Sequence, residues 1–148
     1  MGLLISVGGT RADAEEVAQG AYEKLIRSWP KVSGYDDPQA WVRTIAVRDL
    51  INRHRRGVVA RNKRAAVAAL EWTHGGTEEA AERLDLRDAM AALSVDHRAV
   101  LLLRYVEDLS VADVARALGI SEGTVKSRLS RARAQLAEHL NDPVKEQP

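Results

Sequence analysis

The stretch from Leu109 to Leu136, LSVADVARALGISEGTVKSRLSRARAQL, decides the fold. It predicts two helices around a tight turn. In its first half, apolar residues recur at i, i+3, i+4 and i+7, so a helix would turn one apolar stripe inward: Val111, Val114, Ala115 and Leu118. Ser110 stands at an N-cap position with Asp113 three residues later, and Gly119 supplies the backbone freedom that a turn needs. This is the pattern of a helix-turn-helix motif.

The second helix of this pair, which Ser121 would cap, indicates what the motif binds. One narrow stripe is apolar and must face the core: Val125, Leu129, Ala132 and Leu136. The opposite face carries small residues, with Lys126 and Arg131 beside them: Gly123, Ser127, Ser130 and Ala134. Small residues let a helix sit deep in a DNA groove, and long cations reach base edges or phosphates. The pattern therefore favours DNA binding over a helical hairpin with a solvated basic face.

The composition of the 148 residues limits the class of protein. Hydrophobic residues make up 45% of the chain, which is enough for packed cores, and cysteine is absent. Without cysteine there are no disulfides or thiolate metal sites, which suits a reducing cytoplasm, so we expect a cytoplasmic location. No run approaches the roughly 18 apolar residues that a membrane span needs, so no membrane insertion is expected.

The net charge of +1 hides a division along the chain. Residues 41–64 contain eight Arg or Lys against one acid, a net charge of +7, whereas residues 71–90 contain six acids against two arginines, a net charge of −4. A basic block beside an acidic one predicts a local surface for a polyanion and a separate connector.

The N-terminal third predicts two helices. Residues 12–29 form the first, with acidic opening turns and one apolar face made of Val17, Ala21, Leu25 and Ile26. Residues 30–37 are a loop by composition, and Asp37 followed by Pro38 is a favoured helix start. The second helix, residues 38–56, begins apolar and ends cationic.

The fold class predicted is all-α, with two small helical domains joined by a flexible linker. The first domain covers residues 1–57 and the linker residues 58–82, which include Gly75 and Gly76. The second domain, residues 83–140, is a four-helix helix-turn-helix unit, and residues 141–148 form a tail.

No constellation for catalysis is present in the sequence. The four histidines share no metal-ligand spacing, and Gly8, Gly9 and Thr10 lack the lysine of a phosphate-binding loop. We therefore expect no catalytic residues, metal, cofactor or small-molecule substrate, and a protein that recognises nucleic acid and is not an enzyme.

With both halves considered, the chain resembles bacterial RNA polymerase sigma factors of the extracytoplasmic-function class, within the sigma-70 superfamily. The resemblance covers residues 10–56 and 83–140. Residues 13–19, DAEEVAQ, look like the acidic helix of the family, and residues 38–47, PQAWVRTIAV, look like its minus-ten helix. Residues 123–133, GTVKSRLSRAR, are the most specific match, to the reader of the upstream promoter element.

The resemblance implies a function and a set of contacts. The partners would be RNA polymerase core and promoter DNA, with an anti-sigma factor as a further partner. Polymerase would be bound by Asp13, Glu15, Glu16 and Gln19. The minus-ten element would be bound by Tyr35, Trp41, Arg43, Arg48, Arg53, Arg55 and Arg56. The upstream element would be bound by Ser121, Gly123, Thr124, Lys126, Ser127, Arg128, Ser130, Arg131 and Arg133.

Three departures from the family pattern keep two alternatives open. A leading helix is apparently missing before the acidic helix, Gly20 replaces an acid, and Arg48 replaces a common Asn. One alternative is a helix-turn-helix regulator that acts without polymerase core. The other is a degenerate sigma-like protein that binds an anti-sigma partner.

Overall fold

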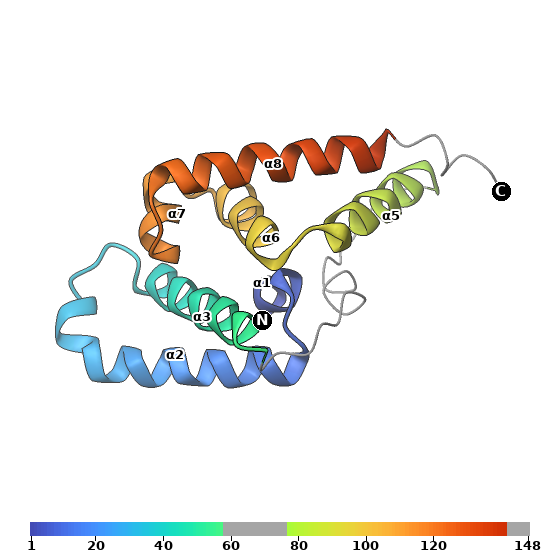
Figure 1. Ribbon diagram of the computed structural model, residues 1–148. Coiled ribbons are helices and arrows are strands. Elements are labelled where there is room, and N and C mark those ends of the chain that lie inside the picture. The colour runs from blue at the N-terminus through green and yellow to red at the C-terminus, as the bar shows by residue number, and fades with distance from the viewer. Residues whose placement is uncertain (58–76, 142–148) are drawn as a thin grey trace.

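The computed structural model describes residues 1–57 and 77–141, which form helices joined by short turns, with no strand in either range (Figure 1). The N-terminal part contains α1 (Gly2–Val7), α2 (Arg11–Val32) and α3 (Pro38–Arg55). A short helix, α1, therefore precedes the acidic helix, where the sequence predicted none; its Leu4 and Val7 are buried in the core. The C-terminal part contains α5 (Thr77–Ala92), α6 (Val95–Leu101), the π-helical segment η1 (Leu102–Val106), α7 (Val111–Leu118) and α8 (Glu122–Leu140). Since η1 continues α6, the C-terminal part is the predicted four-helix unit.

Side chains at the helix starts satisfy backbone N–H groups that have no partner within a helix. The predicted caps are confirmed, because Asp37, Ser110 and Ser121 each accept a hydrogen bond from the backbone N–H three residues later. Helix α2 also begins with a capping box that was not predicted, in which the Thr10 and Asp13 side chains each accept a hydrogen bond from the other's backbone N–H. Gly119 ends α7 in the left-handed region at φ +67, as a turn residue should.

Two predicted boundaries differ in the structure. Helix α2 continues through Pro30 to Val32, so the loop is residues 33–37; a proline keeps a helical φ and here costs only a bond near the helix end. Helix α5 begins at Thr77, so residues 77–82 of the predicted linker are helical. Residues 58–76 of that linker and residues 142–148 of the tail lie outside the described residues.

The predicted apolar face of the first helix was wrong at one position. Ile26 is exposed, whereas Val17 and Ala21 are buried. At 100° per residue, Ile26 lies more than 90° around the helix axis from Leu25 and from the buried stripe. Ile26 was assigned to the same face as the adjacent Leu25, although consecutive residues of a helix point about 100° apart.

Helix α3 lies at the centre of the molecule. It packs on α2 on one side and on α6 and α7 on the other, as Figure 1 shows, and α1 contacts both α3 and α6. At 100° per residue, its buried residues span about half of the helix circumference: Val42, Ala46, Val47, Leu50 and Ile51. One hydrophobic core therefore runs through both parts of the chain, from Leu4 in α1 to Ala132 in α8.

Two glycines give a matched test of this backbone. Changing Gly119→Ala should lower the free energy of unfolding by about 1–2 kcal/mol, because an L-residue is strained at positive φ. Changing Gly20→Ala, inside α2 with open space around its Cα, should raise it by about 0.5–1 kcal/mol. Urea denaturation of both variants measures the two shifts; equal shifts would contradict the assigned backbone.

Candidate nucleic-acid interface

The outer face of α8 carries most of the residues predicted to read the upstream element. Val125, Leu129 and Ala132 are buried, as predicted, so the opposite face points outward. That face is exposed at Gly123, Lys126, Ser127, Ser130 and Arg131. Small residues lie at the centre of this face and the two cations lie at its edges, an arrangement that fits a major groove.

The start of α8 is fixed by its own side chains. The Ser121 hydroxyl accepts from the Thr124 N–H at 3.1 Å and lies 2.8 Å from the Thr124 hydroxyl. The Ser127 hydroxyl donates to the Thr124 carbonyl at 3.2 Å. These bonds hold the first turn in one conformation, so a DNA backbone would meet a preformed helix start.

One cation of α8 points away from this outer face. Arg128 is half-buried, and its Nη1 lies 3.4 Å from Asp96 Oδ1 of α6. Arg133 is exposed and donates from Nη1 to the Tyr105 hydroxyl at 2.7 Å. At 100° per residue Arg133 lies about 20° around the helix axis from Lys126. The structure therefore separates only Arg128 from the other cations of α8 that are predicted to bind DNA.

The arginines of α3 are all engaged within the protein. Arg53 pairs with Glu16 of α2 at 2.6 Å, and Arg56 Nε donates to the Asn52 carbonyl at 3.3 Å. The other three reach from α3 to the C-terminal part of the chain. Their partners are Glu107 for Arg43 at 3.1 Å, the Arg116 carbonyl for Arg48 at 3.3 Å, and Asp96 for Arg55 at 2.8 Å.

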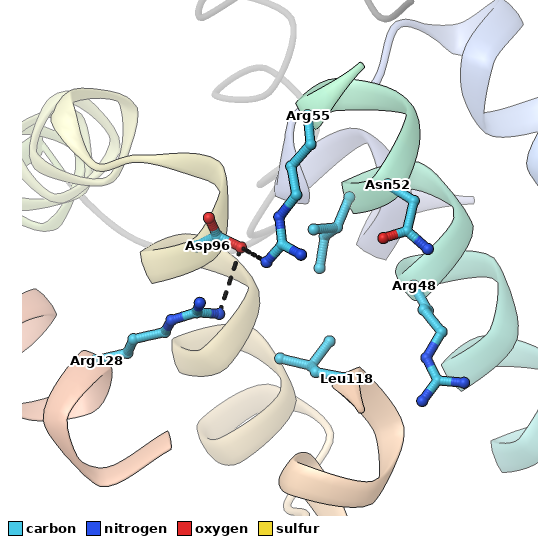
Figure 2. A pocket seen from close by; sticks show the side chains of 7 residues that line it. Arg48, Asn52, Arg55, Asp96, Leu118 and Arg128 are labelled. Atoms are coloured by element: carbon cyan, nitrogen blue, oxygen red, sulfur yellow. Dashed lines mark hydrogen bonds and ion pairs between the residues drawn. The ribbon is translucent and has the colours of Figure 1, made fainter. Parts of the chain in front are cut away.

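Asp96 of α6 forms ion pairs with an arginine of α3 and with an arginine of α8. Figure 2 shows its carboxylate between Arg55 of α3 and Arg128 of α8, in a small pocket that Arg48 and Leu118 also line. Both ion pairs use the same oxygen, Oδ1. The structure thus brings together residues predicted for two separate DNA elements, around one acid that the sequence analysis did not single out.

The two aromatic residues predicted near the minus-ten element differ in position. Tyr35 lies in the exposed loop before α3. Trp41 is half-buried and packs against the hydrophobic core. Tyr35 is therefore the better placed of the two for stacking on an extruded base.

The residues predicted to bind polymerase divide into two groups. Asp13 belongs to the capping box of α2, and Glu16 faces Arg53. That guanidinium donates a hydrogen bond to Glu16 and holds the pKa of this carboxyl below its usual value. Glu15 and Gln19 are exposed, Glu15 beside Arg11 at 3.0 Å.

Helix α2 also shows an outward apolar stripe that the sequence analysis missed. The exposed fractions are 57% for Tyr22, 75% for Ile26 and 51% for Trp29. At 100° per residue, these three share one face with Glu15 and Gln19. The signal was present in the sequence as large apolar residues at i, i+4 and i+7, but only Ile26 was assigned a face, and it was assigned to the core.

The described residues contain no group of three or more His, Asp or Glu that could hold a metal ion. Among the helices in residues 1–57 and 77–141, none is long and apolar enough to cross a membrane.

Comparison with known proteins places the chain in a family. The protein-family model "Sigma-70 region 2" matches residues 1–58, and the family model "Sigma-70, region 4" matches residues 83–136. The chain therefore belongs to the sigma-70 family of RNA polymerase sigma factors. Its relatives place it in the extracytoplasmic-function class, as the sequence resemblance implied.

Two relatives and one solved structure show the extent of the similarity. The chain is 39% identical to the ECF RNA polymerase sigma factor SigL of Mycobacterium tuberculosis, over 84% of this chain and 72% of that protein. It is 33% identical to the RNA polymerase sigma-E factor of Streptomyces antibioticus, over 86% of this chain and 71% of that protein. The sigma factor RpoE of Bartonella quintana, in complex with the anti-sigma factor NepR, is 27% identical with a TM-score of 0.65, over 95% of this chain and 89% of that one.

The ion pair between Glu16 and Arg53 makes a pH-dependent contribution that can be tested. Its partner lowers the pKa of Glu16, so the stabilisation is present above the unfolded pKa and is lost as pH falls through the folded pKa. In a carboxyl NMR titration, Arg53→Gln should raise the pKa of Glu16. The control, Arg11→Gln, removes one positive charge from α2 but does not remove the partner of Glu16, so the pKa of Glu16 should stay lower than in Arg53→Gln. Equal pKa values of Glu16 in the two variants would contradict the pairing.

Proposed function

We propose that this sigma factor binds RNA polymerase core through the outward face of α2 and reads promoter DNA through α8 and the loop and helix around α3. The observation that carries the proposal is the outer face of α8, where Lys126 and Arg131 flank small exposed residues. A major groove accommodates such a face, and the two cations reach bases or phosphates.

The polymerase contact is assigned to the stripe of Glu15, Gln19, Tyr22, Ile26 and Trp29. Large exposed apolar residues beside polar ones form the pattern of a protein interface, with aromatic anchors at its centre. Helices α2 and α8 lie on opposite outer sides of the molecule (Figure 1), so polymerase and upstream DNA can be bound at the same time. This supports a bridge between enzyme and promoter.

The minus-ten contact is assigned to Tyr35 and to the arginines along α3. Tyr35 would stack on an unpaired base, and the arginines would meet the phosphates of the adjoining strand. Arg56 is exposed at the end of α3, next to its half-buried neighbour Arg53. These contacts involve binding alone, so no catalytic step is assigned to the chain, and its place of action is the cytoplasm, with the polymerase.

A second partner is supported by the similarity to a sigma factor solved with an anti-sigma factor. The similarity extends over 95% of this chain, so it includes both of its parts. An anti-sigma factor that binds both parts would control access to the DNA-reading arginines.

The decisive experiment is transcription by purified core polymerase with this chain on a library of genomic fragments. The proposal expects initiation at a small set of fragments that share an upstream and a minus-ten element. Duplex binding without core and without initiation would favour a helix-turn-helix regulator. Binding of an anti-sigma factor without initiation would favour a degenerate sigma-like protein.

The assignment of α8 predicts the effect of removing its outer cations. The double change Lys126→Gln and Arg131→Gln should weaken holoenzyme binding to such a promoter by about tenfold or more, and should reduce its salt dependence. The matched control, Arg27→Gln with Lys31→Gln, removes two exposed cations from α2. If a binding titration gave the same loss of promoter affinity for both double variants, the effect would be one of net charge alone and would contradict the assignment of α8.

The assignment of α2 predicts a separate defect. The double change Ile26→Ala and Trp29→Ala should weaken binding to core polymerase by about tenfold or more, because both anchors are exposed and their loss leaves the fold intact. Arg27→Ala, exposed on another side of the same helix, is the control. The readout is core binding by fluorescence anisotropy; an unchanged affinity for the double variant would refute the docking face.

A further inference from the structure

The π-helical segment η1 presents an exposed tyrosine beside helix α8. Tyr105 is 53% exposed, whereas Leu102 and Leu103 of the same segment are buried. The Glu107 N–H donates to the Leu102 carbonyl at 3.0 Å, which closes the wide turn between α6 and α7. Short π-helical turns often occur at functional sites. A tyrosine this exposed adds little to the core, so its polar contacts decide what it does.

Two arginines from different elements contact this tyrosine. Arg133 of α8 donates from Nη1 to the Tyr105 hydroxyl at 2.7 Å. The guanidinium carbon of Arg104 lies 5.5 Å from the centre of the Tyr105 ring, and Arg104 Nη1 lies 3.9 Å from Asp108 Oδ1. The face of an aromatic ring attracts a cation, so Arg104 restrains the ring while the hydroxyl restrains Arg133.

The contact leaves Arg133 able to bind an anion. A hydroxyl is neutral, so it does not compensate the charge of Arg133, whereas Arg128 is paired with the carboxylate of Asp96. A guanidinium has five N–H donors, and the bond to Tyr105 uses one of them. The remaining donors can form the forked pair that phosphate oxygens accept. Arg133 also lies on the same edge of α8 as Lys126, about 10 Å further along the helix axis.

We propose that Tyr105 is a positioning residue for DNA binding, because its hydroxyl holds the Arg133 guanidinium ready for a phosphate at the edge of the upstream groove. A freely moving arginine loses rotamer freedom when it binds a phosphate, and an arginine that is already held loses less. Tyr105 thereby strengthens a phosphate contact without adding charge. The inference rests on the proposed function of α8 and extends it to a residue outside the helix-turn-helix motif.

Side-chain NMR of the free chain tests the hold on Arg133. Tyr105→Phe keeps the ring for Arg104 but removes the hydroxyl, so the order parameter of the Arg133 Nε–H group should fall. The matched control is Val106→Ala, since Val106 is the adjacent residue and is 57% exposed. This control should leave the order parameter unchanged. An equal order parameter in Tyr105→Phe and in the unmodified chain would overturn the inference.

Promoter binding by the holoenzyme tests the consequence for DNA. Tyr105→Phe changes no charge, yet it should weaken binding to an upstream-element promoter by about twofold to fivefold. Arg133→Gln should weaken binding further and reduce the salt dependence by about one phosphate contact. In the Arg133→Gln background, Tyr105→Phe should have no further effect, because the hydroxyl acts only through the guanidinium. Val106→Ala should bind as the unmodified protein does, and thermal melts check that each variant folds.

The outcomes separate this inference from the proposed function. If the unmodified holoenzyme bound no promoter, the proposed function would be refuted, and the DNA role of Tyr105 with it. Promoter binding that is unchanged in Tyr105→Phe would overturn the positioning role alone. The same is true if Tyr105→Phe causes an equal loss in the Arg133→Gln background. A higher affinity of Tyr105→Phe would show that the hydroxyl holds Arg133 away from DNA, and would also overturn the inference.

Discussion

The packing of α3 between two sets of helices is the constraint on which the rest of the structure depends. Buried apolar side chains span about half of the circumference of this helix, so a single neighbouring helix cannot cover them all. Helix α2 covers one side, α6 and α7 cover the other, and α1 contacts both α3 and α6. Arg43, Arg48 and Arg55 lie at the contact between α3 and the C-terminal helices, whereas Arg53 pairs with Glu16 of α2. Burying α3 on both sides therefore also determines which arginines meet acids and which face water.

The contact between α3 and the C-terminal helices is held by weak, reversible ion pairs. The ion pairs to Asp96 and Glu107 involve side chains that are one-fifth to one-half exposed. Such pairs each contribute about 0–1 kcal/mol and are screened by salt. Several kcal/mol of binding energy from polymerase or from a polyanion can exceed their sum.

The local features of the fold followed from short-range rules. The caps at Asp37, Ser110 and Ser121, the turn at Gly119 and the buried stripe of α8 depend on neighbours within a turn or two, so their sequence pattern was sufficient. The misplaced Ile26 shows the limit of the same rules. An apolar residue at the edge of a stripe can face the core or a partner protein, and the periodicity of one helix does not distinguish them.

The sequence by itself determined the family, the all-α fold class and the face of α8 that points outward, because each depends on helical periodicity and on local motifs. Only the tertiary structure decided where the arginines point. Long side chains reach across helix boundaries, and Asp96 is separated from Arg55 by 41 residues and from Arg128 by 32. No local pattern marks such a contact. The motif from Leu109 to Leu136 thus identified a DNA reader, and the packing of α3 against α6 and α7 showed that one of its cations, Arg128, is paired with Asp96 within the protein.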